Sequence, residues 1–332
     1  MSSFKTAYDE LQTGRLIVLV DDLNHNVSYL TGLLDKVNPE QVNFMIRFGK
    51  GLIYAGINKN QAERLELPIM AGDGWWNGST VSVDHHSSST GISVNERAVT
   101  LKALNMELAR PEHFIRPGHV FPVVYAENGL LERRSVFEAA AEVAGKHGSL
   151  VNTFICELLN NKGEIANYHE VTSFCQTYEL CHVSMSTILK KQGNHSLTRF
   201  TAETIKIPYI NHAIGFPNIN LNLKKYSPPL RSGVYGIRVT CDQQTDIGIM
   251  HVNETEGTKS GKVFDMYIES SLSQRLANKT VFIEVNFFLR PLKFFSSSSI
   301  DDLVVMYKKD NEQVRKYFYL IYHDRIEGSF VL

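Results

Sequence analysis

The chain has 332 residues, of which 43% are hydrophobic and 21% are charged. Its 34 Lys and Arg residues nearly balance its 35 Asp and Glu residues, which excludes a strongly basic nucleic-acid binder and an acidic tail protein. A chain of this length and composition is typical of a globular protein with about two domains.

The sequence shows no sign of export or of a membrane anchor. Residues Met1–Asp9 have no basic and apolar leader, and no run of about 18 apolar residues occurs. The four cysteines form no CxxC pair and have no spacing typical of structural zinc. We therefore expect a cytoplasmic protein with reduced thiols that binds neither membranes nor nucleic acids.

Helix and strand patterns alternate along residues 1–190, which predicts an α/β sandwich around one sheet. The pattern does not decide between a parallel and a mixed sheet. The predicted helices are Phe4–Gln12, Pro39–Phe48, Gln61–Leu65, Val94–Leu104, Ser135–Lys146 and His169–Tyr178, and the predicted strands are Leu16–Val20, Leu52–Ala55, Thr80–Val83, Val120–Val124, Phe154–Leu159 and a segment near Val183.

The pattern changes after the polar, glycine-containing stretch Lys190–Asn194, which is typical of a linker. Residues 195–332 are rich in strand-like runs, which predicts a β-rich α+β domain. The predicted strands are Val234–Val239, Ile247–Val252, Lys262–Ile268, Thr280–Phe288 and Tyr317–Tyr322, and the predicted helices are Leu272–Leu276 and Ile300–Val305.

Several motifs of the first half occur in a characteristic order. They include Thr90–Ser93 (TGIS), Arg116–Pro122 (RPGHVFP) and Cys156–Asn160 (CELLN). With these motifs, residues 4–190 resemble the 3,4-dihydroxy-2-butanone-4-phosphate synthase family, a riboflavin-pathway enzyme that acts on ribulose 5-phosphate with a divalent metal ion. The resemblance implies the α/β sandwich of that family and a homodimer, in which His119 reaches toward the neighbouring subunit's site.

The departures from the family lie where it binds its metal ion. The family follows its Asp-Asp pair with an acidic run, whereas Asp22 is followed here by Leu23–Leu30, which has no carboxylate. The resemblance places the two metal ligands at Asn26 and Val136. Because magnesium prefers carboxylate oxygens and water, we expect no bound metal and no cofactor, and we do not expect the ordinary synthase reaction.

Other family positions keep polar groups, beside a wall that has become apolar and aromatic at residues such as Val136 and Phe137. We hypothesise a divergent, metal-independent enzyme of the lyase or isomerase type, which acts on a small anionic or carbonyl metabolite in a specialised biosynthetic pathway. Glu157 and His119 would carry protons. The candidate substrate-binding residues are Arg133, as the anion site, together with Ser89, Thr90, His25, Tyr54 and Asp22.

Each candidate also has a structural interpretation. His119 can stabilise its turn, Glu157 can be held by backbone hydrogen bonds, and Arg133 can pair with Glu132 or Glu138. Trp75-Trp76 can line a ligand site or pack on the domain edge.

Two alternatives for the first domain stay open. It can be a non-catalytic binding or scaffolding relative, with a pocket collapsed around Tyr29, Tyr54 and Phe137. It can also be a true synthase with displaced ligands, such as Asp84, His85 or Glu132.

The second half is only faintly similar to GTP cyclohydrolase II, the domain that often follows the synthase. Arg199–Glu203 with Pro208 is similar to the start of that domain. Cys241 is its only cysteine, so it cannot build the three-cysteine zinc site of that enzyme. We expect a degenerate or unrelated domain without GTP chemistry.

Overall fold

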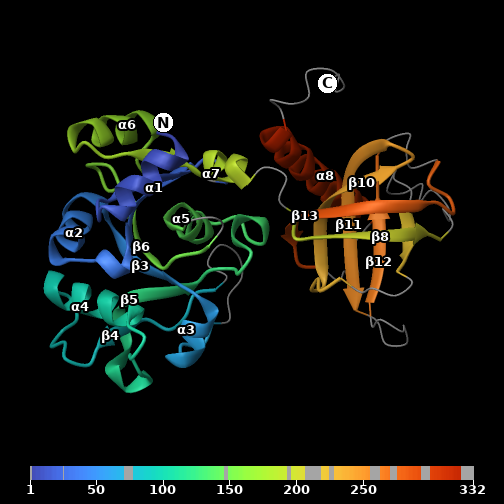
Figure 1. The fold of residues 1–332 in the computed structure, drawn as a ribbon. Coiled ribbons are helices and arrows are strands. Elements are labelled where there is room, and N and C mark those ends of the chain that lie inside the picture. The colour runs from blue at the N-terminus through green and yellow to red at the C-terminus, as the bar shows by residue number, and fades with distance from the viewer. Residues whose placement is uncertain are drawn as a thin grey trace. The chain divides into compact units, whose positions relative to one another are not determined.

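The computed structural model describes residues 2–24, 26–70, 78–145, 149–192, 196–205, 218–223, 228–254, 262–269, 275–292 and 300–322. The chain divides into two compact units, Met1–Gln192 and Gly193–Leu332, which we call the N-terminal and C-terminal domains (Figure 1). Among the described residues, no helix is both long enough and apolar enough to cross a membrane.

A seven-stranded mixed sheet forms the centre of the N-terminal domain, in the order β4-β5-β3-β6-β2-β1-β7. Strands β3 and β5 are parallel, as are β1 and β7, and the other neighbours are antiparallel. This sheet confirms the predicted α/β fold. The strands are β1 (Ile17–Asp21), β2 (Val27–Leu33), β3 (Lys50–Ile57), β4 (Val83–His85), β5 (Phe114–Val124), β6 (Thr153–Leu158) and β7 (His182–Ser184).

Helices cover the sheet, and their starts are encoded locally. Asn38 and Ser93 each accept a backbone N–H in a capping box, which begins α2 and α4. Helix α4 contacts β3, β4 and β5, whereas α1, α5 and α7 contact β1. The helices are α1 (Phe4–Gln12), α2 (Pro39–Phe44), α3 (Lys59–Arg64), α4 (Val94–Asn105), α5 (Val136–Ala144), α6 (Tyr168–Thr177) and α7 (Met185–Gln192).

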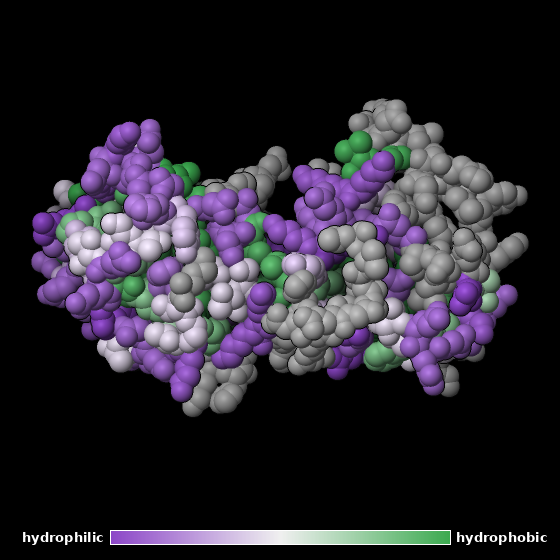
Figure 2. Space-filling view, turned by 90° about the horizontal axis from the view of Figure 1, so that it is seen from above, coloured by the Kyte–Doolittle hydropathy of each residue, from purple (hydrophilic) through white to green (hydrophobic). Residues whose placement is uncertain are grey.

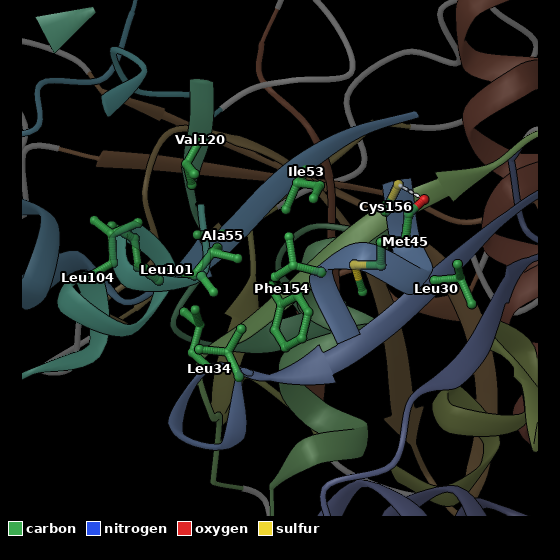
Figure 3. Close-up of a cluster of buried hydrophobic side chains, with 14 of the residues drawn as sticks. Leu30, Leu34, Met45, Ile53, Ala55, Leu101, Leu104, Val120, Phe154 and Cys156 are labelled. Carbon is green, nitrogen blue, oxygen red and sulfur yellow. Dashed lines mark hydrogen bonds between the residues drawn. The ribbon is translucent and has the colours of Figure 1, made fainter. Parts of the chain in front are cut away.

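One face of the sheet packs into a hydrophobic core with α2, α3 and α4. Leu30 and Phe154 belong to this core, where Figure 3 shows them among the other buried side chains. Successive side chains of a strand alternate between faces, so their neighbours Tyr29 and Ile155 point to the opposite face, where α5 contacts β1, β2, β3 and β6. The exterior of this domain seen in Figure 2 is mainly hydrophilic, with hydrophobic residues visible in between.

Strand β2 is the main difference from the predicted elements. No strand is predicted over residues 27–33, yet β2 lies between β6 and β1, and all of its residues are buried. Polar residues interrupt its apolar run, so the sequence pattern does not indicate a strand that is buried on both faces. The predicted helix Pro39–Phe48 is α-helical only to Phe44 and continues as a π-helical turn, Met45–Gly49.

The C-terminal domain contains a closed antiparallel barrel in the order β10-β11-β12-β9-β8-β13. Apolar residues from alternate positions of these strands fill its interior. A long helix, α8 (Ile300–Tyr322), contacts β11. The strands are β8 (Thr198–Thr204), β9 (Asn218–Asn222), β10 (Gly233–Cys241), β11 (Gln244–Glu254), β12 (Lys262–Tyr267) and β13 (Thr280–Arg290).

The predicted strand Tyr317–Tyr322 is wrong, because these residues form the last turns of α8. Val314, Tyr317 and Phe318 are buried at helical spacing, but their aromatic and β-branched composition is also typical of a strand. The predicted helix Leu272–Leu276 lies mostly outside the described residues.

Candidate functional sites

Glu157 lies at the centre of a buried cluster in the N-terminal domain. It is directly opposite Tyr29 of β2, and Tyr54 of β3 lies opposite Ile155, two residues before Glu157. Burial raises the pKa of Glu157. Burial and the Glu157 charge raise the pKa of Tyr54 to about 12 and also raise the pKa of Tyr29. The carboxyl group therefore holds its proton to a higher pH than a free glutamate, between two tyrosines that stay neutral.

Aromatic side chains surround this cluster. The Tyr54 ring lies 5.8 Å from the ring of Phe121 and 5.9 Å from the ring of Phe137, measured between centroids. Tyr29 and Phe137 are each 2% exposed, and Tyr54 is 9% exposed. Glu157 and Tyr54, two of the candidate site residues, therefore lie near each other, and Tyr29 is a direct neighbour of Glu157.

Asn26 and Val136 occupy the positions that the resemblance assigns to metal ligands. Val136 is buried and has no donor atom, and Asn26 is exposed in a left-handed conformation with φ of 56°. Among the described residues, no group of three or more His, Cys, Asp or Glu side chains could hold a metal ion. The residues described at this position therefore do not fit a magnesium ion held by the protein.

His119 lies on β5, on the same face of the sheet as Glu157, since Phe121 two residues further on contacts Tyr54. Strand β3 lies between β5 and β6, so the two backbones are roughly 10 Å apart. The imidazole Nδ1 lies 2.8 Å from Asp84 Oδ2, and the backbone N–H donates to Asp84 Oδ1 at 2.9 Å. The imidazole is 45% exposed, so a carboxylate orients a proton carrier that a ligand can reach.

The loop with Ser89 and Thr90 lies against this pair. Gly91 follows them with φ of 73°, and a Cβ atom added there would lie 1.9 Å from Asp84 Oδ2. Ser89 donates from its backbone and its hydroxyl to Glu96, which starts α4. The hydroxyl of Ser89 is thus tied to the start of a helix.

Arg133 and Asp22 make the contacts of fold-stabilising residues. The Arg133 Nε donates to Glu138 Oε1 at 2.8 Å, and Glu138 is fully buried. Asp22 Oδ1 accepts the backbone N–H of Ser186 at 2.9 Å, at the start of α7. The contact of Arg133 with Glu138 is the structural alternative given for Arg133, and the predicted ligand roles of both residues stay predictions. His25 and Trp75-Trp76 lie outside the described residues.

A second polar cluster lies in the C-terminal domain, where no site residue is predicted from the sequence. Asp265 of β12 is directly opposite Asn220 of β9 and His251 of β11. Met250 precedes His251 and Met266 follows Asp265, and both methionines belong to the barrel core. The row of Asn220, Asp265 and His251 therefore faces the outside of the barrel.

Contacts and burial make Asp265 the central residue of this row. Asn220 Nδ2 donates to Asp265 Oδ1 at 2.6 Å. Burial raises the pKa of Asp265. The sequence signal for Asp265 is a single acidic residue between the apolar residues of a strand. Its partners are identified only by the strand pairing.

Family models match both halves of the chain. The model of 3,4-dihydroxy-2-butanone 4-phosphate synthase matches residues 5–191, and the model of riboflavin kinase matches residues 198–318. The boundary between the two domains, at Gln192 and Gly193, lies in the short stretch of sequence between the two matches. The predicted similarity of the second half to GTP cyclohydrolase II is therefore wrong. That expectation was based on the short segment Arg199–Glu203 with Pro208 and on the usual fusion partner of the synthase.

Bacterial relatives match one or both domains. The 3,4-dihydroxy-2-butanone 4-phosphate synthase of Oceanobacillus iheyensis is 37% identical over 57% of this chain and 94% of its own length. The riboflavin biosynthesis protein RibBA of Staphylococcus saprophyticus is 31% identical over 77% of this chain and 72% of its own length. The RibBA of Bacillus mycoides is 32% identical, and the match spans 57% of its length.

Solved structures show the same architecture. A 3,4-dihydroxy-2-butanone 4-phosphate synthase in complex with two magnesium ions is 28% identical, with a TM-score of 0.52 over 57% of this chain and 96% of its own. RibBX, a two-domain synthase from A. baumannii, has a TM-score of 0.65 over 100% of this chain and 94% of its own. At 19% identity, this second likeness shows the fold alone.

The hypothesis of a divergent enzyme in a specialised pathway is wrong, because both domains match families named for the riboflavin pathway and the relatives include riboflavin biosynthesis proteins. The comparisons also do not support the expectation that the protein is a metal-independent enzyme or a lyase. That hypothesis was based on the replaced residues around Asn26, although the ordered motifs of the family are kept. The matches over residues 5–191 show that the chain belongs to the 3,4-dihydroxy-2-butanone 4-phosphate synthase family.

Proposed function

We propose that this chain serves the riboflavin pathway and that its C-terminal domain transfers a phosphoryl group from ATP to riboflavin. The match of residues 198–318 to riboflavin kinase supports the proposal. The observation that carries it is the partly buried, hydrogen-bonded pair of Asp265 and Asn220. Kinases use a carboxylate to orient the attacking hydroxyl group and to accept its proton.

Asp265 meets the requirements of that carboxylate. Asn220 fixes Oδ1, and no hydrogen bond among the described residues engages Oδ2, which is then available to the riboflavin hydroxyl. Burial raises the pKa of Asp265, which makes its carboxylate a stronger base than that of a free aspartate. In this mechanism Asp265 orients the hydroxyl and takes its proton as the phosphoryl group arrives from MgATP, the second substrate.

The Asp265→Asn variant tests this role. We expect FMN formation from riboflavin and MgATP to fall by about 10²–10⁴-fold, since the amide cannot accept the proton. The product is measured by its fluorescence after chromatographic separation. Asp242→Asn is the matched control, because the Asp242 side chain is 73% exposed, and it should keep the wild-type rate. A wild-type chain that forms no FMN, or a fully active Asp265→Asn variant, contradicts the proposal.

A second candidate function is the synthase reaction of the family in the N-terminal domain. It is favoured by Glu157 and the His119–Asp84 pair, which lie on one face of the sheet with their backbones roughly 10 Å apart. A carboxyl group with a raised pKa and an oriented imidazole can add and remove protons on the two sides of a small sugar phosphate.

Release of formate from ribulose 5-phosphate, with and without added magnesium, measures this reaction. We expect wild-type turnover and a loss of about 10²–10⁴-fold in Glu157→Gln, because Gln cannot transfer a proton. Glu164→Gln changes an exposed residue shortly after β6 and should leave the rate unchanged. Formate at the level of a protein-free blank under both conditions would exclude this second function.

A further inference from the structure

His251 lies between Asp265 and helix α8. It is directly opposite Asp265 in the ladder of β11 and β12, so both side chains occupy the outer face of the barrel with Cβ atoms roughly 5 Å apart. Asn220 holds the equivalent position on the other side of Asp265. The partly buried Asp265 side chain therefore has an amide side chain on one neighbouring strand and an imidazole on the other.

Helix α8 fixes the imidazole through Tyr307. The two rings are stacked, with centroids 5.3 Å apart and planes at 19°, and the Tyr307 hydroxyl lies 3.4 Å from His251 Nδ1. The Tyr307 hydroxyl also hydrogen-bonds Tyr267. We assign it as the donor to Nδ1, which leaves the proton of the neutral ring on Nε2. Burial and the nearby Arg290 charge lower the pKa of His251 to about 4, so the ring is neutral at physiological pH.

His251 Nε2 is a buried nitrogen without a hydrogen-bond partner in the structure. Native proteins rarely leave a buried donor unsatisfied, and such groups often belong to functional sites. Asp265 is the carboxylate of the same row. Hydrogen bonds at catalytic sites are often long without substrate and shorten when it binds.

We propose that His251 is a positioning residue for Asp265, donating its Nε2–H to the Asp265 carboxylate when riboflavin is bound. This inference rests on the proposed kinase function. The hydrogen bond keeps the carboxylate oriented toward the hydroxyl and favours its charged form. The other titratable groups at the imidazole are Tyr267, Tyr307 and Arg290, and Arg290 is paired with Asp310 of α8.

The titration of Asp265 in the full-length chain tests this coupling directly. Aspartate labelled with ¹³C at the carboxyl group is followed by NMR in the presence of riboflavin, and the Asp265 signal is assigned by its loss in Asp265→Asn. We expect His251→Phe to raise the Asp265 pKa by roughly one unit, a tenfold change in proton affinity. His251→Gln keeps an N–H donor, so the Asp265 pKa in this variant should lie between the wild-type value and that of His251→Phe. Tyr319→Phe, an exposed change on the same helix, should leave the signal at its wild-type pKa.

The pH dependence of FMN formation separates this inference from the kinase proposal. In His251→Phe, the acid limb of kcat should move to higher pH by the same amount, with the riboflavin KM changed less than about twofold. Near-ultraviolet circular dichroism verifies that the variants fold. If the chain forms no FMN while the Asp265 pKa still moves, the kinase proposal fails and the coupling holds. If FMN forms but the Asp265 pKa is the same in wild type and His251→Phe, the positioning role is overturned.

Discussion

Replacing Glu138 with alanine is expected to lower the free energy of unfolding of the N-terminal domain by about 3–5 kcal/mol, the usual effect of removing one partner of a buried ion pair. Glu138 is fully buried at the start of α5. Its Oε1 accepts the Ala126 backbone N–H and the Arg133 Nε–H, both at 2.8 Å, and its Oε2 accepts the Ser135 hydroxyl. The variant leaves the Arg133 guanidinium, 20% exposed, without this counterion.

Tryptophan fluorescence reports this change selectively, since both tryptophans of the chain lie in its N-terminal half. Denaturant unfolding of the full chain should show an early N-terminal transition in Glu138→Ala. Glu127→Ala, an exposed residue near the same helix, should change stability by less than about 0.5 kcal/mol. Replacing both Arg133 and Glu138 with apolar residues should recover most of the loss. A Glu138→Ala variant as stable as wild type would contradict this prediction.

Elements with local signals could be predicted from the sequence. Helix α1 spans the predicted residues Phe4–Gln12, and α4 begins at the predicted Val94. Ser93 and Glu96 form a capping box there, and both residues are visible in the sequence. The ordered motifs around Arg116–Pro122 gave the family because they keep both identity and spacing.

Strand β2 and the polar row of the barrel depend on pairing between distant segments. Tyr29 meets Glu157 only when β2 pairs with β6, and Asn220 meets Asp265 across 45 residues of chain. A shift of one residue in either ladder would turn these side chains to the other face. Registers of this kind cannot be read from local composition, so the second site was missed.

An ion pair between Arg290 and Asp310 connects α8 to the barrel. Arg290 Nε lies 2.9 Å from Asp310 Oδ1, and its terminal nitrogen lies 2.6 Å from Oδ2. The two side chains are 18% and 5% exposed. Asp310→Ala should destabilise the contact between α8 and β13 by about 3–5 kcal/mol, since it leaves a largely buried guanidinium without its counterion. Asp310→Asn keeps a hydrogen-bond acceptor and should cost less.

Hydrogen exchange of peptides from β13 and α8, followed by mass spectrometry, measures this loss in the domain that has no tryptophan. The exposed pair of Lys279 and Asp242 provides the control, because Asp242→Ala should change protection by less than about 1 kcal/mol. Since α8 carries Tyr307, a loosened helix should also release the His251 ring. Asp310→Ala should therefore shift the Asp265 titration in the direction expected for His251→Phe. Wild-type protection of both elements in Asp310→Ala would show that α8 stays on the barrel without this ion pair.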